Sequence, residues 1–220
     1  MKEGSGFRAQ GPEDRLPVHG FVLAGGRSVR MGQDKALLRF GGRPMVEIAV
    51  EKLREFCAEV WIAGSRTDLS LYAPVVRDER EAAGPAAGME AGLGAANEAW
   101  AMFLPTDVPL VPAELLRLWG DAVMKRGVRA SYLRCGEELH PALCMLHRDC
   151  LPVFRAALES GERKLTRILE RLDSGRLWVA EAAEFAPEGA ELGAWFENVN
   201  TPEDMARAGG ILGERDGAHG

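Results

Sequence analysis

The chain has 220 residues, of which 46% are hydrophobic and 27% charged, as is usual for a globular protein long enough to bury a full core. Its formal net charge of −6 argues against partners that need a broad basic surface, so we expect neither nucleic acid nor a membrane as a partner. Four cysteines without a CxxC pair or zinc-type spacing, together with no apolar run of membrane-spanning length, predict a cytoplasmic protein with free thiols.

Composition divides the chain into a leader, one domain and a tail. Residues 1–17 mix glycine, proline and charge without an apolar core, which predicts a disordered leader and not a signal peptide. Residues 18–210 carry periodic apolar patterns that fit a single domain. Residues 211–220 are expected to fray.

Short apolar runs alternate with helical patterns along this domain. We predict buried strands at residues 18–24, 60–63, 74–77, 100–104, 130–134, 142–146 and 177–179. The spacing between them predicts helices over 44–56, 86–98, 112–125, 150–159 and 164–172, and a short closing helix that begins at Thr201. Polar positions of the first helix, Lys52 among them, are expected to face water, and Gly88, Gly92 and Gly94 call for close packing or a ligand. This order predicts an α/β fold with a mostly parallel central sheet and helices on both faces.

The stretch from Leu23 to Lys35 is the strongest functional signal, because an apolar strand breaks abruptly into glycines and cations. Gly25 and Gly26 allow a ligand to approach the main chain, while Arg30 and Lys35 bring positive charge to the same place. The stretch matches neither the Walker pattern GxxxxGK[ST] nor the dinucleotide pattern GxGxxG. It predicts a phosphate-binding loop of another type.

Two aspartates follow later strands. Asp78 comes directly after the run at 74–77, and Asp107 follows the run at 100–104. Ligands of an open parallel sheet bind beyond the carboxyl ends of its strands. We therefore expect both carboxylates to lie beside the glycine loop and to form one site with it.

Motifs in a fixed order extend through the chain: Leu-Ala-Gly-Gly at 23–26, Arg-Met-Gly at 30–32, Asp-Lys at 34–35, Gly-Pro at 84–85, Pro-Thr-Asp-Val-Pro at 105–109, His-Pro at 140–141, Gly-Glu-Arg at 161–163 and Asn-Val-Asn-Thr-Pro at 198–202. The first block is similar to the signature of nucleotidyltransferases with a Rossmann-like fold. The whole series resembles the molybdenum cofactor guanylyltransferase family, which joins GMP from GTP to molybdopterin. The resemblance implies a three-layer Rossmann-like domain and an enzyme that forms the guanine dinucleotide cofactor and pyrophosphate.

The resemblance also implies roles for individual residues. It places GTP against Leu23, Ala24, Gly25, Gly26, Lys35, Ser65, Asp78 and Asp107. Ser65 is included because the asparagine that many relatives carry at the end of the second strand corresponds here to Ala63. Catalysis would fall to Arg30, Lys35 and Asp107, and Asp107 would hold Mg²⁺ with a second oxygen from Asn200.

Four residues are candidates for the acceptor side, where molybdopterin would bind: His140, Arg163, Lys164 and Asn198. Transfer of GMP needs in-line attack by a phosphate that is already anionic, so charge neutralisation matters more than a general base. Each candidate also has an ordinary structural explanation. Arg163 and Lys164 fit the solvated start of a helix, His140 fits a packed histidine, and asparagine often precedes a capped helix.

Two alternatives stay open at this point. The same scaffold serves other nucleotidyltransferases, such as a molybdenum cofactor cytidylyltransferase or a sugar-phosphate enzyme, and nucleotide preference separates them. A non-catalytic module would bind nucleotide or cofactor without turnover, although Lys35, Asp107 and Asn200 favour an enzyme. Proteins of molybdenum insertion and molybdoenzyme maturation are further partners that the resemblance implies.

Overall fold

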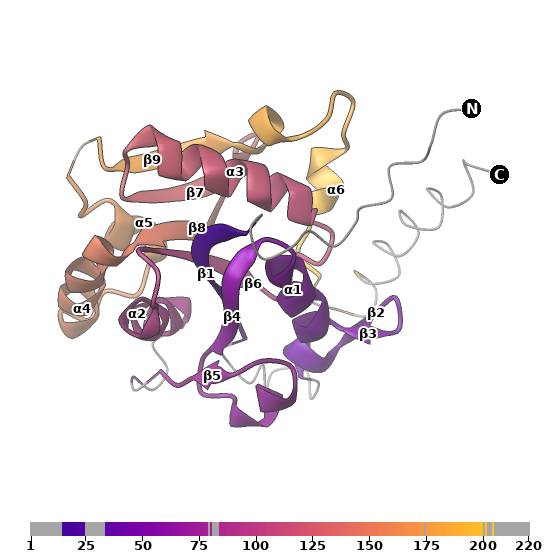
Figure 1. The fold of residues 1–220 in the computed structure, drawn as a ribbon, viewed down its shortest axis with the longest axis horizontal. Coiled ribbons are helices and arrows are strands. Elements are labelled where there is room, and N and C mark those ends of the chain that lie inside the picture. The colour runs from indigo at the N-terminus through magenta and orange to yellow at the C-terminus, as the bar shows by residue number, and fades with distance from the viewer. Residues whose placement is uncertain are drawn as a thin grey trace.

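The computed structural model describes residues 15–24, 34–78, 80, 84–173, 175–199, 201 and 204. Their centre is a seven-stranded sheet with helices on both faces (Figure 1), which confirms the predicted fold class. Its strands are β1 (Leu16–Leu23), β4 (Cys57–Ala63), β5 (Val75–Val76), β6 (Trp100–Pro105), β7 (Ala130–Cys135), β8 (Glu138–His147) and β9 (Leu177–Glu181). They lie in the order β5-β4-β1-β6-β8-β7-β9. Of these described strands, β8 alone is antiparallel to its neighbours.

The register of the central strands places their carboxyl ends at one edge. Leu23, the last residue of β1, lies opposite Ala63 of β4 and Pro105 of β6. Because β8 runs in the other direction, its first residues reach the same edge, where His140 pairs with Leu133. We call this edge of the sheet the carboxyl edge.

Alternation along the buried strands divides the core into two layers. In β1, Val18 and Val22 pack with one cluster, while Phe21 and Leu23 pack with the other. The first layer holds α1 (Met45–Arg54), α3 (Ala113–Arg126) and α6 (Leu192–Phe196). The second holds α2 (Pro85–Ala95), α4 (Leu151–Glu159) and α5 (Leu165–Leu169). A strand with apolar residues on both faces needs cover on both sides, which explains the three layers.

Helix α2 approaches the sheet closely through two of the three glycines. A Cβ on Gly92 would lie 2.7 Å from Cε1 of Phe103, and one on Gly88 would lie 3.3 Å from Cδ2 of Leu23. A Cβ on Gly94 would meet nothing within 4 Å. Gly88 and Gly92 are therefore explained by packing, and Gly94 is not.

Short elements complete the described chain. The segment after the first motif forms η3 (Lys35–Leu37) and then a hairpin of β2 (Arg39–Phe40) and β3 (Arg43–Pro44), with Gly41 and Gly42 at its turn. The other 3-10 turns are η4 (Thr67–Leu71), η5 (Arg148–Cys150) and η6 (Ala182–Phe185). At the predicted closing helix, Thr201 Oγ1 accepts from the Asp204 N–H at 3.1 Å, and Asp204 Oδ2 accepts from the Thr201 N–H at 3.0 Å. This reciprocal pair is a capping box.

Several predicted boundaries were wrong where pairing or local geometry decides them. β1 begins at Leu16 and not at 18, and its register against β4 shifts around Pro17, which has no N–H to donate. β8 begins at Glu138 and not at 142, because it pairs with β7 along a longer ladder. α2 ends at Ala95 and not at 98, where Ala96 turns extended. α5 covers only Leu165–Leu169 of the predicted 164–172.

The four cysteines are free thiols. Burial raises the pKa of the Cys57, Cys144 and Cys150 thiols, so they remain protonated in the folded chain near neutral pH. In the part of the chain that the structure describes, no helix has both the length and the apolar character needed to cross a membrane.

Candidate active site

The candidate site centres on an ion pair at the carboxyl edge. Lys35, the first residue of η3, places its Nζ 2.7 Å from Oδ2 of Asp107, which follows β6. The two side chains are 28% and 23% exposed, so both can reach a ligand. The structure thus brings together a cation from the glycine-loop side and a carboxylate from the next strand, as the sequence predicts.

The turn that carries Lys35 is fixed by Asp34 and by a buried arginine. Oδ1 of Asp34 accepts from the Ala36 N–H at 3.2 Å, and its carbonyl accepts from the Leu37 N–H at 3.0 Å. Arg66 donates to both carboxylate oxygens of Asp34, with 2.8 Å between Nη1 and Oδ1. Hydrogen bonds to Asp68 and then to Asp34 raise the pKa of the Arg66 guanidinium.

The turn that carries Asp107 is held from two other sides. The Asp107 carbonyl accepts from the Val199 N–H at 2.8 Å, so Val199, which follows Asn198 in the sequence, lies against this turn. Lys52 of α1 donates to the carbonyls of Pro109 and Val111, with 2.7 Å to the latter. Burial lowers the pKa of Lys52 to about 8. The prediction that Lys52 faces water was therefore wrong.

Four other predicted nucleotide-binding residues that the structure describes follow or end strands at the same edge. Leu23 and Ala24 are buried at the end of β1, so their contribution to a ligand would come from the main chain. Asp78 follows β5 and is half-buried, and this burial raises its carboxyl pKa. Ser65 is exposed just beyond β4, whereas Ala63 is fully buried among core residues. A contact between Ser65 and nucleotide stays a prediction.

His140 is the acceptor-side candidate with the most defined surroundings. It is 8% exposed, and its ring centroid lies 4.8 Å from that of Phe196. Burial lowers the pKa of His140, while Glu138 and Asp107 raise it by a smaller amount, so we treat the imidazole as neutral near pH 7. Its Nε2 has no hydrogen-bond partner among the described residues.

The remaining acceptor-side candidates are solvent-exposed. The backbone N–H groups of Arg163 and Lys164 donate to Oε1 of Glu162 at 2.9 and 2.8 Å, in the turn that precedes α5. No contact in the described part of the chain joins their side chains to Lys35 or Asp107. Asn198 is also exposed, next to Val199.

Four predicted residues, Gly25, Gly26, Arg30 and Asn200, lie outside the described residues. Sequence reasoning missed Arg66 and Lys52, which fix the two turns of the ion pair. Arg66 lies just past the end of β4, and a cation at a strand end was the available signal. Lys52 gave none, because a lysine on an amphipathic helix usually faces solvent.

The donor set fits a magnesium ion that is shared with phosphates. Among the described residues, no group of three or more His, Cys, Asp or Glu side chains gathers as an all-protein metal site would require. Mg²⁺ usually takes one or two carboxylates from protein and completes its octahedron with water and substrate phosphates. Asp107, with a partly exposed carboxylate at the carboxyl edge, meets that requirement.

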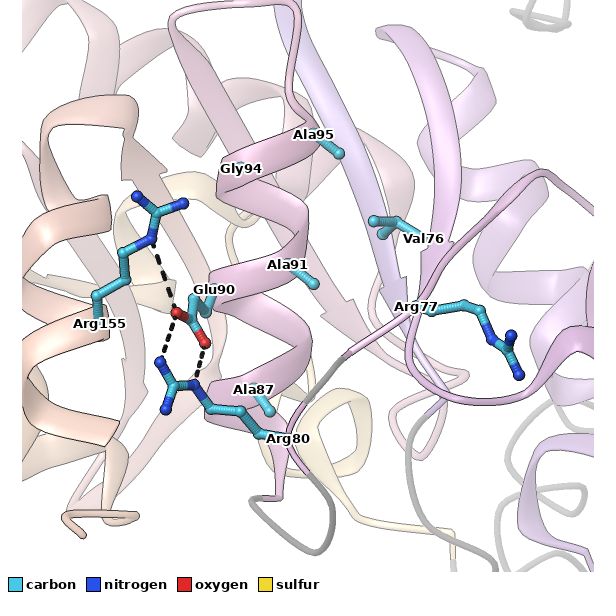
Figure 2. Close-up of a pocket in the computed structure, with 9 residues that line it drawn as sticks. All are labelled: Val76, Arg77, Arg80, Ala87, Glu90, Ala91, Gly94, Ala95 and Arg155. Carbon is cyan, nitrogen blue, oxygen red and sulfur yellow. Dashed lines mark hydrogen bonds and ion pairs between the residues drawn. The ribbon is translucent and has the colours of Figure 1, made fainter. Parts of the chain in front are cut away.

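A pocket of about 600 Å³ lies elsewhere, between α2, the end of β5 and α4. Figure 2 shows Glu90 directed at Arg80 and Arg155, while Arg77 points away from them. Nε of Arg80 lies 2.7 Å from Oε2 of Glu90. Of the predicted site residues that the structure describes, none lines this pocket, so it does not locate the nucleotide.

Comparisons with known proteins agree with this geometry. A family model described as MobA-like NTP transferase domain matches residues 20–176. A molybdenum cofactor guanylyltransferase from Serratia proteamaculans is 36% identical over 196 residues, which cover 86% of this chain and 93% of that protein. One from Yersinia pseudotuberculosis is 32% identical over 194 residues, covering 85% and 92%.

Among solved structures, molybdopterin-guanine dinucleotide biosynthesis protein A from Archaeoglobus fulgidus matches with a TM-score of 0.75 and 24% identity. The match covers 89% of this chain and 99% of that chain, and it shows a shared fold. The family model spans both Lys35 and Asp107, and the two bacterial relatives cover about six sevenths of the chain, 86% and 85%. The chain therefore belongs to the MobA-like NTP transferase family and is a nucleotidyltransferase.

Proposed function

We propose that the protein transfers GMP from GTP to the molybdopterin cofactor, forming molybdopterin guanine dinucleotide and pyrophosphate. The observation that carries the proposal is the Lys35–Asp107 pair at the carboxyl edge, with the Val199 N–H hydrogen bonded to the Asp107 carbonyl. The relatives that cover this chain are named for the same activity.

Each half of the ion pair has a task in this reaction. Lys35 would bind an oxygen of the triphosphate and neutralise charge on the departing pyrophosphate. Asp107 would hold Mg²⁺, together with Asn200, and the bound ion would supply further charge neutralisation and alignment of the phosphates. The attacking group is an anionic phosphate of molybdopterin, so no side chain has to remove a proton from it.

The neighbouring residues support the two substrates. Leu23 and Ala24 would offer main-chain groups to the nucleotide, and Asp78 would receive a donor from it. His140 would donate or accept one hydrogen bond through its buried Nε2, which has no partner among the described residues. Arg163, Lys164 and Asn198 would contribute further contacts to molybdopterin from the exposed side.

A comparison of four nucleotides as substrates tests this proposal. Purified protein with molybdopterin and Mg²⁺ is given GTP, ATP, CTP or UTP separately, and pyrophosphate release and the dinucleotide product are measured. We expect product with GTP and strongly reduced product with Asp107→Ala. Product with CTP but not GTP would assign a cytidylyltransferase instead. Binding of GTP without product from any nucleotide would point to a non-catalytic module.

A further inference from the structure

Arg66 occupies a buried position between two carboxylates. Its side chain is 6% exposed, whereas those of Asp34 and Asp68 are 31% and 56% exposed. Nε and Nη2 of Arg66 lie 2.8 and 2.6 Å from the two oxygens of Asp68. Nη1 and Nη2 donate to the two oxygens of Asp34. A guanidinium can serve two carboxylates at once in this way because its donors form a planar fork.

The Asp34 side of this arrangement leads directly to the catalytic lysine. Asp34 accepts from the Ala36 N–H with its side chain and from the Leu37 N–H with its carbonyl, so it sets the start of η3. Lys35 is the residue between Asp34 and Ala36. A shift of the Asp34 carboxylate would therefore rotate the turn from which Lys35 reaches Asp107.

The other end of the arrangement is anchored in the sheet. Arg66 follows β4 by three residues, and Gly64 between them has φ 143°, a conformation that side chains rarely allow. The Gly64 N–H donates to the Val76 carbonyl of β5 at 3.0 Å, and the Arg66 carbonyl accepts from the Leu69 N–H at 3.1 Å. Arg66 is thus tied to two strands and to η4.

We propose that Arg66 is a positioning residue, which holds Lys35 in its catalytic geometry through Asp34. This role rests on the proposed function only in that Lys35 must act on the triphosphate. A purely structural role fits the exposed fractions of the two aspartate side chains less well. Asp34 and Asp68 can both be rehydrated when the guanidinium is removed, so the fold is expected to survive its loss.

Kinetics of Arg66→Met test the role. Because a small misplacement of a catalytic group can cost about 100-fold in rate, we expect kcat to fall by roughly 10- to 100-fold. The KM for GTP should change by less than about threefold, because the proposed function gives the nucleotide further main-chain contacts at Leu23 and Ala24. Arg54→Met is the matched control. Arg54 binds the Tyr72 carbonyl at the end of the same η4 from an exposed position, and its removal should leave kcat unchanged.

A double-mutant cycle with Asp34→Asn asks whether the effect passes through Asp34. Asparagine can keep the cap on the Ala36 N–H but weakens the bond to the arginine. We expect the double variant to be no slower than the slower single variant. Losses that multiply, or a rise in KM with unchanged kcat, would overturn the proposal.

Amide hydrogen exchange gives a readout that needs no substrate. In Arg66→Met, the amides of Ala36 and Leu37 should exchange faster, while those of central strand β1 keep their protection. Unchanged exchange at both amides would also overturn the proposal. If the wild-type protein made no product from GTP, the proposed function would fail, and the exchange result would still decide whether Arg66 fixes the Lys35 turn.

Discussion

The two halves of the sheet differ in how they present the predicted site residues. In the parallel half, formed by β5, β4, β1 and β6, the predicted site residues Lys35 and Asp107 form an ion pair, and Arg66 pairs with Asp34 beside them. In the mixed half, formed by β8, β7 and β9 with the segments after them, Arg134 also pairs with Glu181, but the predicted site residues Arg163, Lys164 and Asn198 stand exposed.

The difference fits the two substrates of a nucleotidyl transfer. A triphosphate must be held straight at the reacting phosphorus, which requires charges that are already in place. An acceptor that contributes a single phosphate oxygen to the reaction needs less exact placement elsewhere along its length. We therefore infer that rate is determined in the parallel half, and that the mixed half mainly affects acceptor affinity.

The largest effect is expected for Lys35→Met. Loss of one well-placed charged donor costs about 3 kcal/mol in the transition state, or roughly 100- to 1,000-fold in kcat. The Asp107 carboxylate left behind is partly exposed and can be hydrated, so thermal stability should change little. Steady-state kinetics and a thermal unfolding curve measure both quantities. A change in kcat below about threefold would remove Lys35 from the chemistry.

Lys52 supports the Asp107 turn in the parallel half, and its lowered pKa predicts that the free energy of unfolding depends on pH. Its pKa is about 8 in the folded protein and near 10.4 in an unfolded chain. Between these values the unfolded chain binds more protons, so the free energy of unfolding rises with pH, by about 1–3 kcal/mol.

Buried thiols oppose this trend, since their raised pKa values make the unfolded chain lose protons first as pH rises. The wild type and Lys52→Met both contain these thiols, so the contribution of the thiols cancels in the difference between the two free energies of unfolding. Urea unfolding at about pH 7.5 and about pH 9.5 should show that the wild type gains stability relative to Lys52→Met. An equal difference at both pH values would mean that Lys52 titrates normally.

Two glycines of α2 offer a matched test of packing. Gly92→Ala puts a methyl group 2.7 Å from the buried ring of Phe103, which should cost about 1–3 kcal/mol and outweigh the gain in helix propensity. Gly94→Ala meets nothing within 4 Å and should stabilise the protein by about 0.5–1 kcal/mol. Chemical denaturation compares the two variants. Equal effects would show that the helix does not approach the sheet as described.

The smallest effect is expected in the mixed half, for Arg163→Ala combined with Lys164→Ala. Both side chains are exposed, so stability should stay within about 0.5 kcal/mol of wild type. Loss of exposed charge contacts to the acceptor phosphate should raise the KM for molybdopterin roughly fivefold, about 1 kcal/mol, with the KM for GTP unchanged. A large fall in kcat instead would contradict the division of labour between the two halves.

Much of this architecture could be predicted because its signals are local. Apolar runs located the strands of the seven-stranded sheet, though not the short hairpin of β2 and β3, and the ends of β1 and β6 predicted where Lys35 and Asp107 meet. Boundaries failed where the partner strand decides them, as for β8, whose first residues lengthen a ladder with β7. Nothing near Pro141 in the sequence signals that pairing.

The contacts of the supporting cations could not be predicted for a related reason. Arg66 and Asp34 are 32 residues apart, and Lys52 is 57 residues from Pro109. Each pair forms only when the chain folds, so the local sequence does not predict it. Glycines and strand-end carboxylates, in contrast, can be recognised from the residues next to them. The resemblance to a known family predicted which groups act on the substrates, but not which residues hold those groups in place.

The Lys35–Asp107 ion pair also makes the affinities of two ligands depend on one another. A cation that binds Asp107 alone leaves the lysine without a counter-charge, and an anion that binds Lys35 alone leaves the aspartate without one. A metal–triphosphate complex replaces both partners at once, so each component strengthens the binding of the other by the same factor. Calorimetric titration of GTP with and without Mg²⁺ should therefore give tighter binding with the metal, and Asp107→Asn should abolish that gain.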